Sequence, residues 1–384
     1  MTILGIRPDI IRLSMIIPLL DEKFDHILVH SGQHYDPEMD SMFFEELGVR
    51  LPDHNMGVGK ALTGSAATYY NQIGLLFQKT YEAIQKFKPD IIMYLGDTNT
   101  VVSSFIAARE GVPIIHVEGG MRNFDWRTPE EKNRTVIDHL ADFIYSYLPH
   151  HRDNLLAEGI PSYRSVAIGN VIVDVINKYT ETMTYSQGDY IFSTIHREEN
   201  TKDMSKFRRI LDSLEYIGNK YHPVLLPLIP SAKNRISKFG EFWKIWKHID
   251  FIKPLPFKGC LKMQKEAKYV ITDSGTLQEE SCILGTPCMV VRGSTERSET
   301  IECGATVLSD PNDSSIFEDF HKLQDIKRNS WVSPLGDGKS SKRLVDHLVK
   351  LDESRFFKKS RQMNNSKYTA RIVRAMGCPS IPAF

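Results

Sequence analysis

Short apolar runs alternate along the chain with longer stretches in which apolar residues recur every three or four positions. In the first part of the chain such runs occupy residues 2–5, 26–29, 91–95 and 113–117. They end in glycine or polar residues, and a helix-like stretch at 66–87 precedes the third run. Continuous apolar strands joined by helices are typical of a parallel sheet covered on both faces. The pattern therefore predicts an α/β fold.

The same alternation starts again after about residue 168. Further apolar runs lie at 190–194, 224–228, 250–252, 269–272, 288–291 and 306–308. Two successive halves of this kind predict two doubly wound, Rossmann-like domains that face each other across a cleft. We expect an N-terminal domain at 1–168, a C-terminal domain at 169–351, and a polar, basic peripheral tail at 352–384.

Composition argues against several classes of protein. The 384 residues agree with two domains at ~150 residues each, and 48 basic and 48 acidic residues give no net charge. This balance argues against a nucleic-acid-binding surface. No apolar run reaches the ~18 residues of a membrane span, and charges at Arg7, Asp9 and Arg12 are unlike a signal peptide. Five cysteines without a CxxC pair favour neither a disulfide framework nor a zinc site. We therefore expect a cytoplasmic protein with no membrane segment and no metal.

Polar residues follow almost every predicted strand at its carboxyl end, where open parallel sheets bind ligands. The segments concerned begin at Gly5, Gly96, Glu118, His196, Asp273 and Arg292. His196 stands directly after a strand and beside Arg197, a position that favours a functional role over a structural one. The polar segment around Gln33 and His34 is weaker evidence, since such residues are ordinary in loops.

The segment 272–280 reads as a strand end followed by a helix start. The amides of Ser274, Gly275 and Thr276 would then lie at the helix N-terminus, where free N–H groups and the helix dipole bind phosphate. Ser274 could simply cap the helix, but Gly275 favours the close approach of a ligand. Glu280, further along the helix, could reach a ribose hydroxyl.

Carboxylates gather at a second place. Thr128 and the acids after it fit an ordinary helix start, which would explain Glu131 without any function. However, Glu131 and Arg134 share one helix face, while Asp97 and Glu118 end neighbouring strands. Carboxylates held close together raise one another's pKa, which suits general acids and bases.

The motifs occur together in an order that resembles a known family. They are Gly5-Ile6-Arg7-Pro8, Gly32-Gln33-His34, Gly96-Asp97-Thr98, His116 to Arg122, Pro129 to Arg134, Gly169-Asn170, His196 to Asn200, Thr272 to Glu280, and Thr295-Glu296-Arg297. Over residues 2–350 they resemble the non-hydrolysing UDP-N-acetylglucosamine 2-epimerases. The resemblance implies the two-domain fold of the B-type glycosyltransferases, with a last helix that returns toward the N-terminal domain.

The resemblance also implies a mechanism and a site. UDP leaves by anti elimination across C1–O and C2–H and then adds back, with a proton delivered to the other face of C2. The catalytic residues implied are Asp97, Glu118, Glu131 and His196. The substrate-binding residues implied are Arg7, Arg12, Arg122, Arg134, Asn170, Arg197, Ser274, Gly275, Thr276, Glu280 and Arg297. The implied protein is a homodimer that makes polysaccharide precursors from a UDP-sugar, with no cofactor and no metal.

Some positions depart from the family pattern. Thr68 and Ile229 stand where many relatives carry residues that, with Gln33 and His34, bind a second UDP-sugar as activator. We therefore expect hyperbolic rather than sigmoidal kinetics. The alternatives are a 2-epimerase of a UDP-6-deoxy-L-N-acetylhexosamine, a hydrolysing epimerase, a UDP-sugar glycosyltransferase of the same fold, and an inactive nucleotide-sugar sensor.

Overall fold

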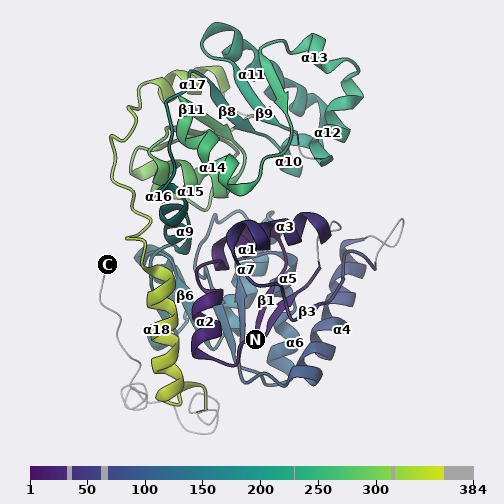
Figure 1. Cartoon of the computed structure of the whole chain (residues 1–384), viewed down its shortest axis with the longest axis vertical. Helices are drawn as coiled ribbons and strands as arrows, with labels where there is room; N and C mark the ends of the chain where they lie inside the picture. Colours follow the sequence, from purple (N-terminus) through teal and green to yellow (C-terminus); the bar gives the residue numbers. More distant parts are fainter. Residues whose placement is uncertain (33–36, 62–67, 229, 313–315, 359–384) are drawn as a thin grey trace. The chain divides into compact units, whose positions relative to one another are not determined.

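The computed structural model describes residues 1–32, 37–61, 68–228, 230–312 and 316–358. The chain forms two compact units (Figure 1). Unit 1 contains Met1–Val175 and the chain from Gly336 onward, and unit 2 contains Ile176–Leu335. No helix in the described ranges is long and apolar enough to cross a membrane.

Unit 1 is built on a seven-stranded parallel sheet in the order β3-β2-β1-β4-β5-β6-β7. Its strands are β1 (Thr2–Leu4), β2 (Leu28–His30), β3 (His54–Asn55), β4 (Ile92–Leu95), β5 (Ile114–Val117), β6 (Phe143–Ser146) and β7 (Ser165–Ala167). Its helices are α1 (Arg7–Leu13), α2 (Ile17–Lys23), α3 (Pro37–Leu47), α4 (Tyr69–Phe87), α5 (Asn99–Val102), α6 (Ser104–Arg109), α7 (Pro129–Leu140), α8 (Pro149–Ala157), the short η2 (Ser162–Arg164) and α18 (Ser340–Glu353).

Unit 2 is built on a six-stranded parallel sheet in the order β10-β9-β8-β11-β12-β13. Its strands are β8 (Ile191–Thr194), β9 (Val224–Pro227), β10 (Ile249–Ile252), β11 (Tyr269–Thr272), β12 (Cys288–Val291) and β13 (Thr306–Ser309). Its helices are α10 (Glu198–Thr201), α11 (Met204–Lys220), α12 (Pro230–Ile236), η3 (Ser237–Phe239), α13 (Phe242–Ile245), α14 (Phe257–Glu266), α15 (Gly275–Leu284), α16 (Ser298–Glu302) and α17 (Ile316–Gln324). Helix α9 (Val171–Thr180) runs from unit 1 into unit 2.

Both sheets have the doubly wound strand order, so the predicted α/β class with two parallel sheets is confirmed. In this order successive strands are added toward one edge of the sheet and, after a switch between the first and fourth strands, toward the other edge. Ligands bind outside the carboxyl ends of the strands at that switch. The switch points are β1/β4 in unit 1 and β8/β11 in unit 2. Each sheet therefore places one candidate site.

Apolar side chains of strands and helices pack into a core in each unit. In unit 1 the strand residues Ile92 and Ile114 pack with Ile84, Ala107 and Ile137 from three helices, all of them buried. Unit 2 has a comparable core beneath α11 and α17. Burial of these side chains fixes the strands, and the strands in turn fix the positions of the loops at their ends.

Three strands were not predicted. β3 has two polar residues and β7 has only one bulky apolar residue, so neither forms an apolar run, and β6 is a four-residue buried run soon after α7. The helix predicted at 66–87 begins at Tyr69, because Thr68 accepts a hydrogen bond from the Asn71 amide at 3.2 Å and so caps α4.

The last described helix belongs to unit 1. Ser340 and Ser341 at the start of α18 donate backbone hydrogen bonds to Asp174, at 3.1 and 2.8 Å. Further along, His347 Nδ1 lies 3.1 Å from the hydroxyl of Tyr145 on β6. The chain changes unit inside α9 and again at Gly336, whereas the predicted limits fall at 168/169 and 351/352. Those domain limits stay predictions, and residues 359–384 of the predicted tail lie outside the described residues.

Candidate active site

Two acidic residues stand at the carboxyl ends of neighbouring strands in unit 1. Leu95 of β4 pairs with Val117 of β5, so Asp97 and Glu118 emerge from the sheet beside each other. Glu118 is buried and has a φ of 75°, a left-handed conformation that is costly for a residue with a side chain. Strain of this kind is retained where the surrounding structure requires one exact side-chain position.

Two buried arginines connect these carboxylates. Arg134 on α7 pairs through Nη2 with Asp97 and, at 3.0 Å, with Glu118 Oε1. Arg12 on α1 pairs with the other oxygen of Glu118. The structure therefore brings four predicted residues into one cluster, with two carboxylates and two guanidinium groups. Glu118 and both arginines are buried, whereas the Asp97 side chain is 19% exposed. Charge interactions are stronger in such a buried environment than in bulk water.

Asp9 is a further carboxyl group beside this cluster, and sequence analysis did not select it. Its Oδ2 accepts hydrogen bonds from the amides of Gly5 at 2.8 Å and Ile6 at 3.1 Å. Burial raises the pKa of Asp9 to about 7, and the negative charge of Glu118 adds to this, although the two amide bonds oppose it. Its place just after β1, at the switch point of the sheet, was the available signal.

Glu131 is buried on α7 but faces a loop. Its two oxygens accept hydrogen bonds from the amides of Asn123 at 3.0 Å and Phe124 at 3.2 Å. Phe124 has a φ of 57°, so the carboxylate holds a strained turn. Thr128 is the N-cap residue of α7 as predicted, although its side chain makes no capping hydrogen bond. The structure gives Glu131 a loop-holding role, and its predicted catalytic role remains a proposal.

His116 and Asp138 form a buried pair that sequence reasoning missed. His116 Nδ1 lies 2.7 Å from Asp138 Oδ1, and Nε2 lies 2.8 Å from the Gly96 carbonyl oxygen. The imidazole ring therefore bridges a carboxylate on α7 and a backbone carbonyl at the end of β4. Asp138 Oδ2 also accepts from the Gly120 amide at 3.0 Å. The pair thus joins the residue before Asp97 to the turn after Glu118.

Arg122 completes this network. It donates to Asp138 and to Glu158 at 2.7 Å each, and it too is buried. Burial alone would raise the pKa of Asp138, but the charges and hydrogen bonds of His116 and Arg122 hold it below its usual value. Arg122, predicted to bind substrate, therefore has partners that fix the protein's own structure. A polar residue inside an otherwise apolar strand, as His116 is, was the signal for this network.

The remaining predicted residues of unit 1 have separate surroundings. Arg7 is the first residue of α1 and lies 5.3 Å from the ring centre of Phe43. Asn170 is buried and accepts from the Ile172 amide at 3.0 Å, at the start of α9. The predicted second-site residues Gln33 and His34 lie outside the described residues, as does Ile229.

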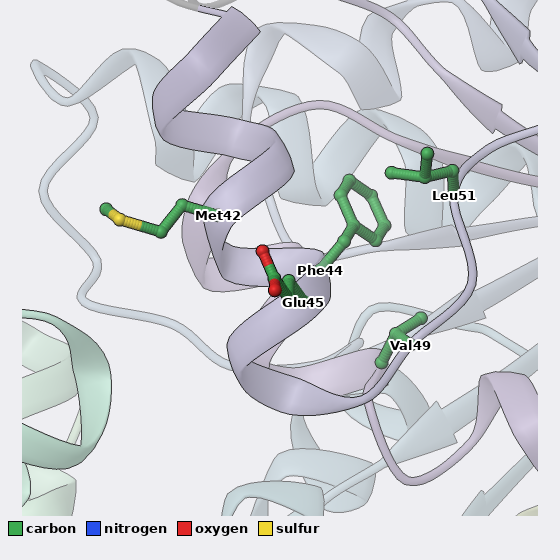
Figure 2. A pocket seen from close by; sticks show the side chains of 5 residues that line it. All are labelled: Met42, Phe44, Glu45, Val49 and Leu51. Atoms are coloured by element: carbon green, nitrogen blue, oxygen red, sulfur yellow. The ribbon is translucent and has the colours of Figure 1, made fainter.

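A pocket in unit 1 is separate from these residues. The residues that line it, labelled in Figure 2, are Met42, Phe44, Glu45, Val49 and Leu51. It lies between the end of α3 and the loop that follows this helix. None of the predicted site residues lines it.

In unit 2, the start of α15 has the predicted form. Ser274 is the N-cap, and its hydroxyl accepts from the Leu277 amide at 3.5 Å. Arg297 packs directly on Gly275: a Cβ on this glycine would lie 2.4 Å from Arg297 Nη1. Arg297 is buried and pairs with Glu279 at 3.0 Å. The Ser274 amide, one of the three predicted to bind phosphate, instead donates to the Thr272 hydroxyl at 3.0 Å. A guanidinium group beside a helix N-terminus is a suitable environment for a phosphate group.

His196 lies beside this helix start. Strand β8 pairs with β11 through Thr194 and Thr272, which brings the loop after β8 next to Asp273. Buried Asp273 accepts from the amides of His196 at 3.0 Å and Arg197 at 2.9 Å. The His196 side chain is 39% exposed, with Nδ1 3.4 Å from Asp273. Asp273 thus positions an accessible imidazole, a role that sequence analysis did not assign to it.

The other predicted residues of unit 2 differ in exposure. Thr276 and Arg197 are half-buried near the same helix start. Glu280 is buried and accepts from Gln264 Nε2 of α14 at 2.6 Å. The structure thus shows Glu280 in contact with the interior of unit 2, and its predicted ribose contact remains a proposal.

Comparisons with known proteins show which family the chain resembles. The family model described as UDP-N-acetylglucosamine 2-epimerase matches residues 20–349. A UDP-N-acetylglucosamine 2-epimerase of Methanococcus maripaludis is 34% identical over 362 residues, covering 90% of this chain and 96% of the relative. A UDP-2,3-diacetamido-2,3-dideoxy-D-glucuronate 2-epimerase of Pseudomonas aeruginosa is 31% identical, covering 91% and 99%.

A solved structure is also similar. The Methanocaldococcus jannaschii UDP-GlcNAc 2-epimerase in complex with UDP-GlcNAc and UDP has a TM-score of 0.83 and 35% identity, covering 91% of this chain and 99% of that one. The resemblance inferred from the sequence motifs is confirmed. With the family model matched over both units and relatives similar along nearly their whole length, the chain belongs to the UDP-N-acetylglucosamine 2-epimerase family and is an epimerase.

Proposed function

We propose that this enzyme interconverts UDP-N-acetylglucosamine and UDP-N-acetylmannosamine and keeps the sugar bound to UDP in the product. The observation that carries the proposal is the cluster in which Arg134 pairs with both Asp97 and Glu118. Inversion at C2 requires removal of the C2 proton and its return to the opposite face. Two carboxylates at adjacent strand ends are suited to this pair of proton transfers.

We propose an elimination route because UDP is attached to C1, next to the carbon that is inverted, and can leave as an anion. Departure of UDP from C1 as the C2 proton is removed gives a 2-acetamidoglucal, and re-addition of UDP with a proton on the other face gives the epimer. Negative charge grows on the diphosphate as the C1–O bond breaks. The amides at the start of α15 and the buried Arg297 are suited to stabilise this charge, and His196 is exposed enough to contact it.

Arginines in the carboxylate cluster serve the same chemistry. Arg12 and Arg134 hold Glu118 in its left-handed conformation and provide positive charge beside it. When one carboxylate receives a proton its ion pair weakens, and the shared guanidinium can strengthen its bond to the other. For the proton transfers to balance, one carboxylate starts ionised and takes the C2 proton, while the other starts protonated and gives its proton to the opposite face. The net charge of the cluster is then the same before and after the reaction.

Deuterium incorporation tests the proposal. Incubation of UDP-N-acetylglucosamine with the enzyme in deuterated water is expected to give an intact UDP-sugar that carries deuterium at C2. Free N-acetylmannosamine would instead indicate a hydrolysing epimerase, and no exchange would contradict the proposed reaction. Asp97→Asn is expected to abolish exchange. Asp142→Asn is the matched control, because Asp142 accepts from the Ile114 amide at the other end of β5.

The Pseudomonas aeruginosa relative favours a second candidate substrate, a UDP-2,3-diacetamido-2,3-dideoxy-D-glucuronate. The same exchange assay run with that sugar and with a UDP-6-deoxy-L-N-acetylhexosamine decides among the three by their values of kcat/KM. From the family resemblance we further propose a cytoplasmic homodimer that supplies polysaccharide precursors, and light scattering of the purified protein tests the dimer.

A further inference from the structure

Two cysteines of unit 2 lie close together near the C-terminal ends of two helices, α15 and α16. Cys282 is in α15 itself, and Cys303 is the C-cap residue of α16. Their sulfur atoms are 3.9 Å apart. We propose that Cys282 and Cys303 form a reversible disulfide that weakens nucleotide binding at the other end of α15.

Distance and exposure support a thiol pair that can react. A disulfide bond is about 2.05 Å long, so the sulfur atoms must approach by about 1.9 Å, which small side-chain rotations and a slight helix shift can supply. Cys303 is partly exposed, whereas Cys282 is buried. An external oxidant therefore meets Cys303 first, and Cys282 is the resolving thiol behind it.

The two thiols also differ in acidity, and the accessible one, Cys303, is the more acidic. A hydrogen bond from Cys282 lowers the pKa of Cys303, while the same contact and burial raise the pKa of Cys282. The thiolate is the attacking form in thiol–disulfide exchange, so the accessible residue is also the more reactive one.

Cys288 provides a contrast within the same unit. It is wholly buried in β12, and burial raises its pKa to about 12. Cys260 is half-buried, and its sulfur lies 3.7 Å from Gln264 Nε2. Both residues lie apart from the contact between Cys282 and Cys303 and serve as controls.

A low-molecular-weight disulfide such as glutathione disulfide can oxidise the two cysteines in two steps. The Cys303 thiolate attacks one sulfur, the external S–S bond breaks, and the first glutathione leaves as a thiolate that takes up a proton. Cys282 then loses its proton and attacks Cys303 Sγ, which releases the second glutathione as a thiol. The two protein thiols are oxidised by two electrons, and one external disulfide is reduced to two thiols.

Nucleotide binding is affected because α15 and α16 also meet around Arg297, the N-cap residue of α16. Arg297 pairs with Glu279 of α15, and there is no free space between its guanidinium group and Gly275. If the disulfide draws Cys303 toward α15, the short helix α16 shifts and Arg297 moves against the helix start. This consequence rests on the proposed function, which places the diphosphate at that start.

Mass spectrometry and calorimetry test the inference. Purified full-length protein is equilibrated with glutathione disulfide and digested without reduction. A cross-linked peptide containing Cys282 and Cys303 is expected, and dithiothreitol should remove it. Cys282→Ser and Cys303→Ser should abolish it, whereas Cys288→Ser and Cys260→Ser should not. If no such peptide forms in excess oxidant, the disulfide is overturned.

The effect on binding is measured by titrating UDP into the reduced and oxidised proteins. Oxidation is expected to weaken binding by ~10-fold, within the usual range of coupling between two sites, and Cys303→Ser should not respond to oxidant. An unchanged affinity in cross-linked protein would overturn the switch. A reduced protein that fails to bind UDP would contradict the proposed function and the switch together, while the peptide map would still decide the disulfide.

Discussion

Replacing Asp138 with asparagine is a strong test of how the carboxylate cluster is held. Asp138 is fully buried and accepts hydrogen bonds from His116, the Gly120 amide and Arg122, at 2.7, 3.0 and 2.7 Å. Asparagine keeps the shape of the side chain. It removes the negative charge and presents an N–H group to neighbours that are themselves donors.

The magnitude follows from these contacts. Breaking a buried ion pair by removing one partner costs about 3–5 kcal/mol, because the other charges stay buried without compensation. Asparagine retains one acceptor oxygen, which preserves part of the hydrogen bonding at about 1 kcal/mol. We therefore expect Asp138→Asn to lower the free energy of unfolding of unit 1 by about 3 kcal/mol.

Glu158→Gln is the matched control. Glu158 pairs with the same Arg122 at 2.7 Å, but its side chain is 27% exposed. Water can replace the lost interaction there, so the cost should stay below about 1 kcal/mol. Hydrogen exchange, monitored by mass spectrometry, measures the stability of unit 1 in both variants, with peptides of unit 2 as an internal reference. Equal losses in the two variants would refute the reasoning.

Acid titration gives an independent test, because the direction in which stability changes with pH follows from the pKa shift of Asp138. The pKa of Asp138 is lower in the folded protein than in the unfolded chain. Its ionised form therefore contributes stability above the unfolded pKa of ~3.9, and this is lost as pH falls through the folded value. The stability gap between wild type and Asp138→Asn should narrow as the pH falls below about 4. A gap that widens would contradict the assignment.

Three further substitutions test other parts of the site. Arg134→Met leaves Asp97 and Glu118 without their shared cation, and kcat should fall ~100-fold or more with C2 exchange as the readout; an unchanged kcat would remove Arg134 from the chemistry. Gly275→Ala places a Cβ 2.4 Å from a guanidinium nitrogen, so UDP affinity measured by calorimetry should fall, and tight binding would contradict the diphosphate assignment. Burial raises the pKa of Asp9 to about 7, so its ionisation removes stability as pH rises from ~4 through 7. Asp9→Asn should therefore show a smaller decline in unfolding midpoint over that range, and a parallel decline would refute the shift.

Much of the fold was predictable because buried parallel strands are continuous apolar runs. The strands β11 and β12 were predicted with the bounds that the structure gives, Tyr269–Thr272 and Cys288–Val291. β7 was missed because Ser165 and Ala167 flank its single bulky apolar residue, Val166, so no apolar run marks it. Strands this short are stabilised by their neighbours in the sheet and not by their own sequence.

Residues of the candidate site could be predicted from the sequence only where their position after a strand is enough to bring them together. Asp97 and Glu118 follow adjacent strands, and the sheet necessarily brings them together. The partner of His116 could not be predicted in this way, because Asp138 is on α7 and meets the histidine only after the helix packs on the sheet. Tertiary pairing of this kind depends on packing angles that no single segment encodes.

The carboxylates in and near the candidate site have two distinct kinds of partner in this molecule. Asp9 and Asp273 accept hydrogen bonds from backbone amides of the loops after β1 and β8, and Glu131 does the same for a strained turn. Asp97 and Glu118 instead pair with arginine side chains. A loop-holding carboxylate needs only an acceptor oxygen, so an amide can replace it in part, whereas proton transfer needs the acid itself. Glu131→Gln should therefore retain measurable C2 exchange and Asp97→Asn should not, and loss of exchange in both would assign Glu131 to the chemistry.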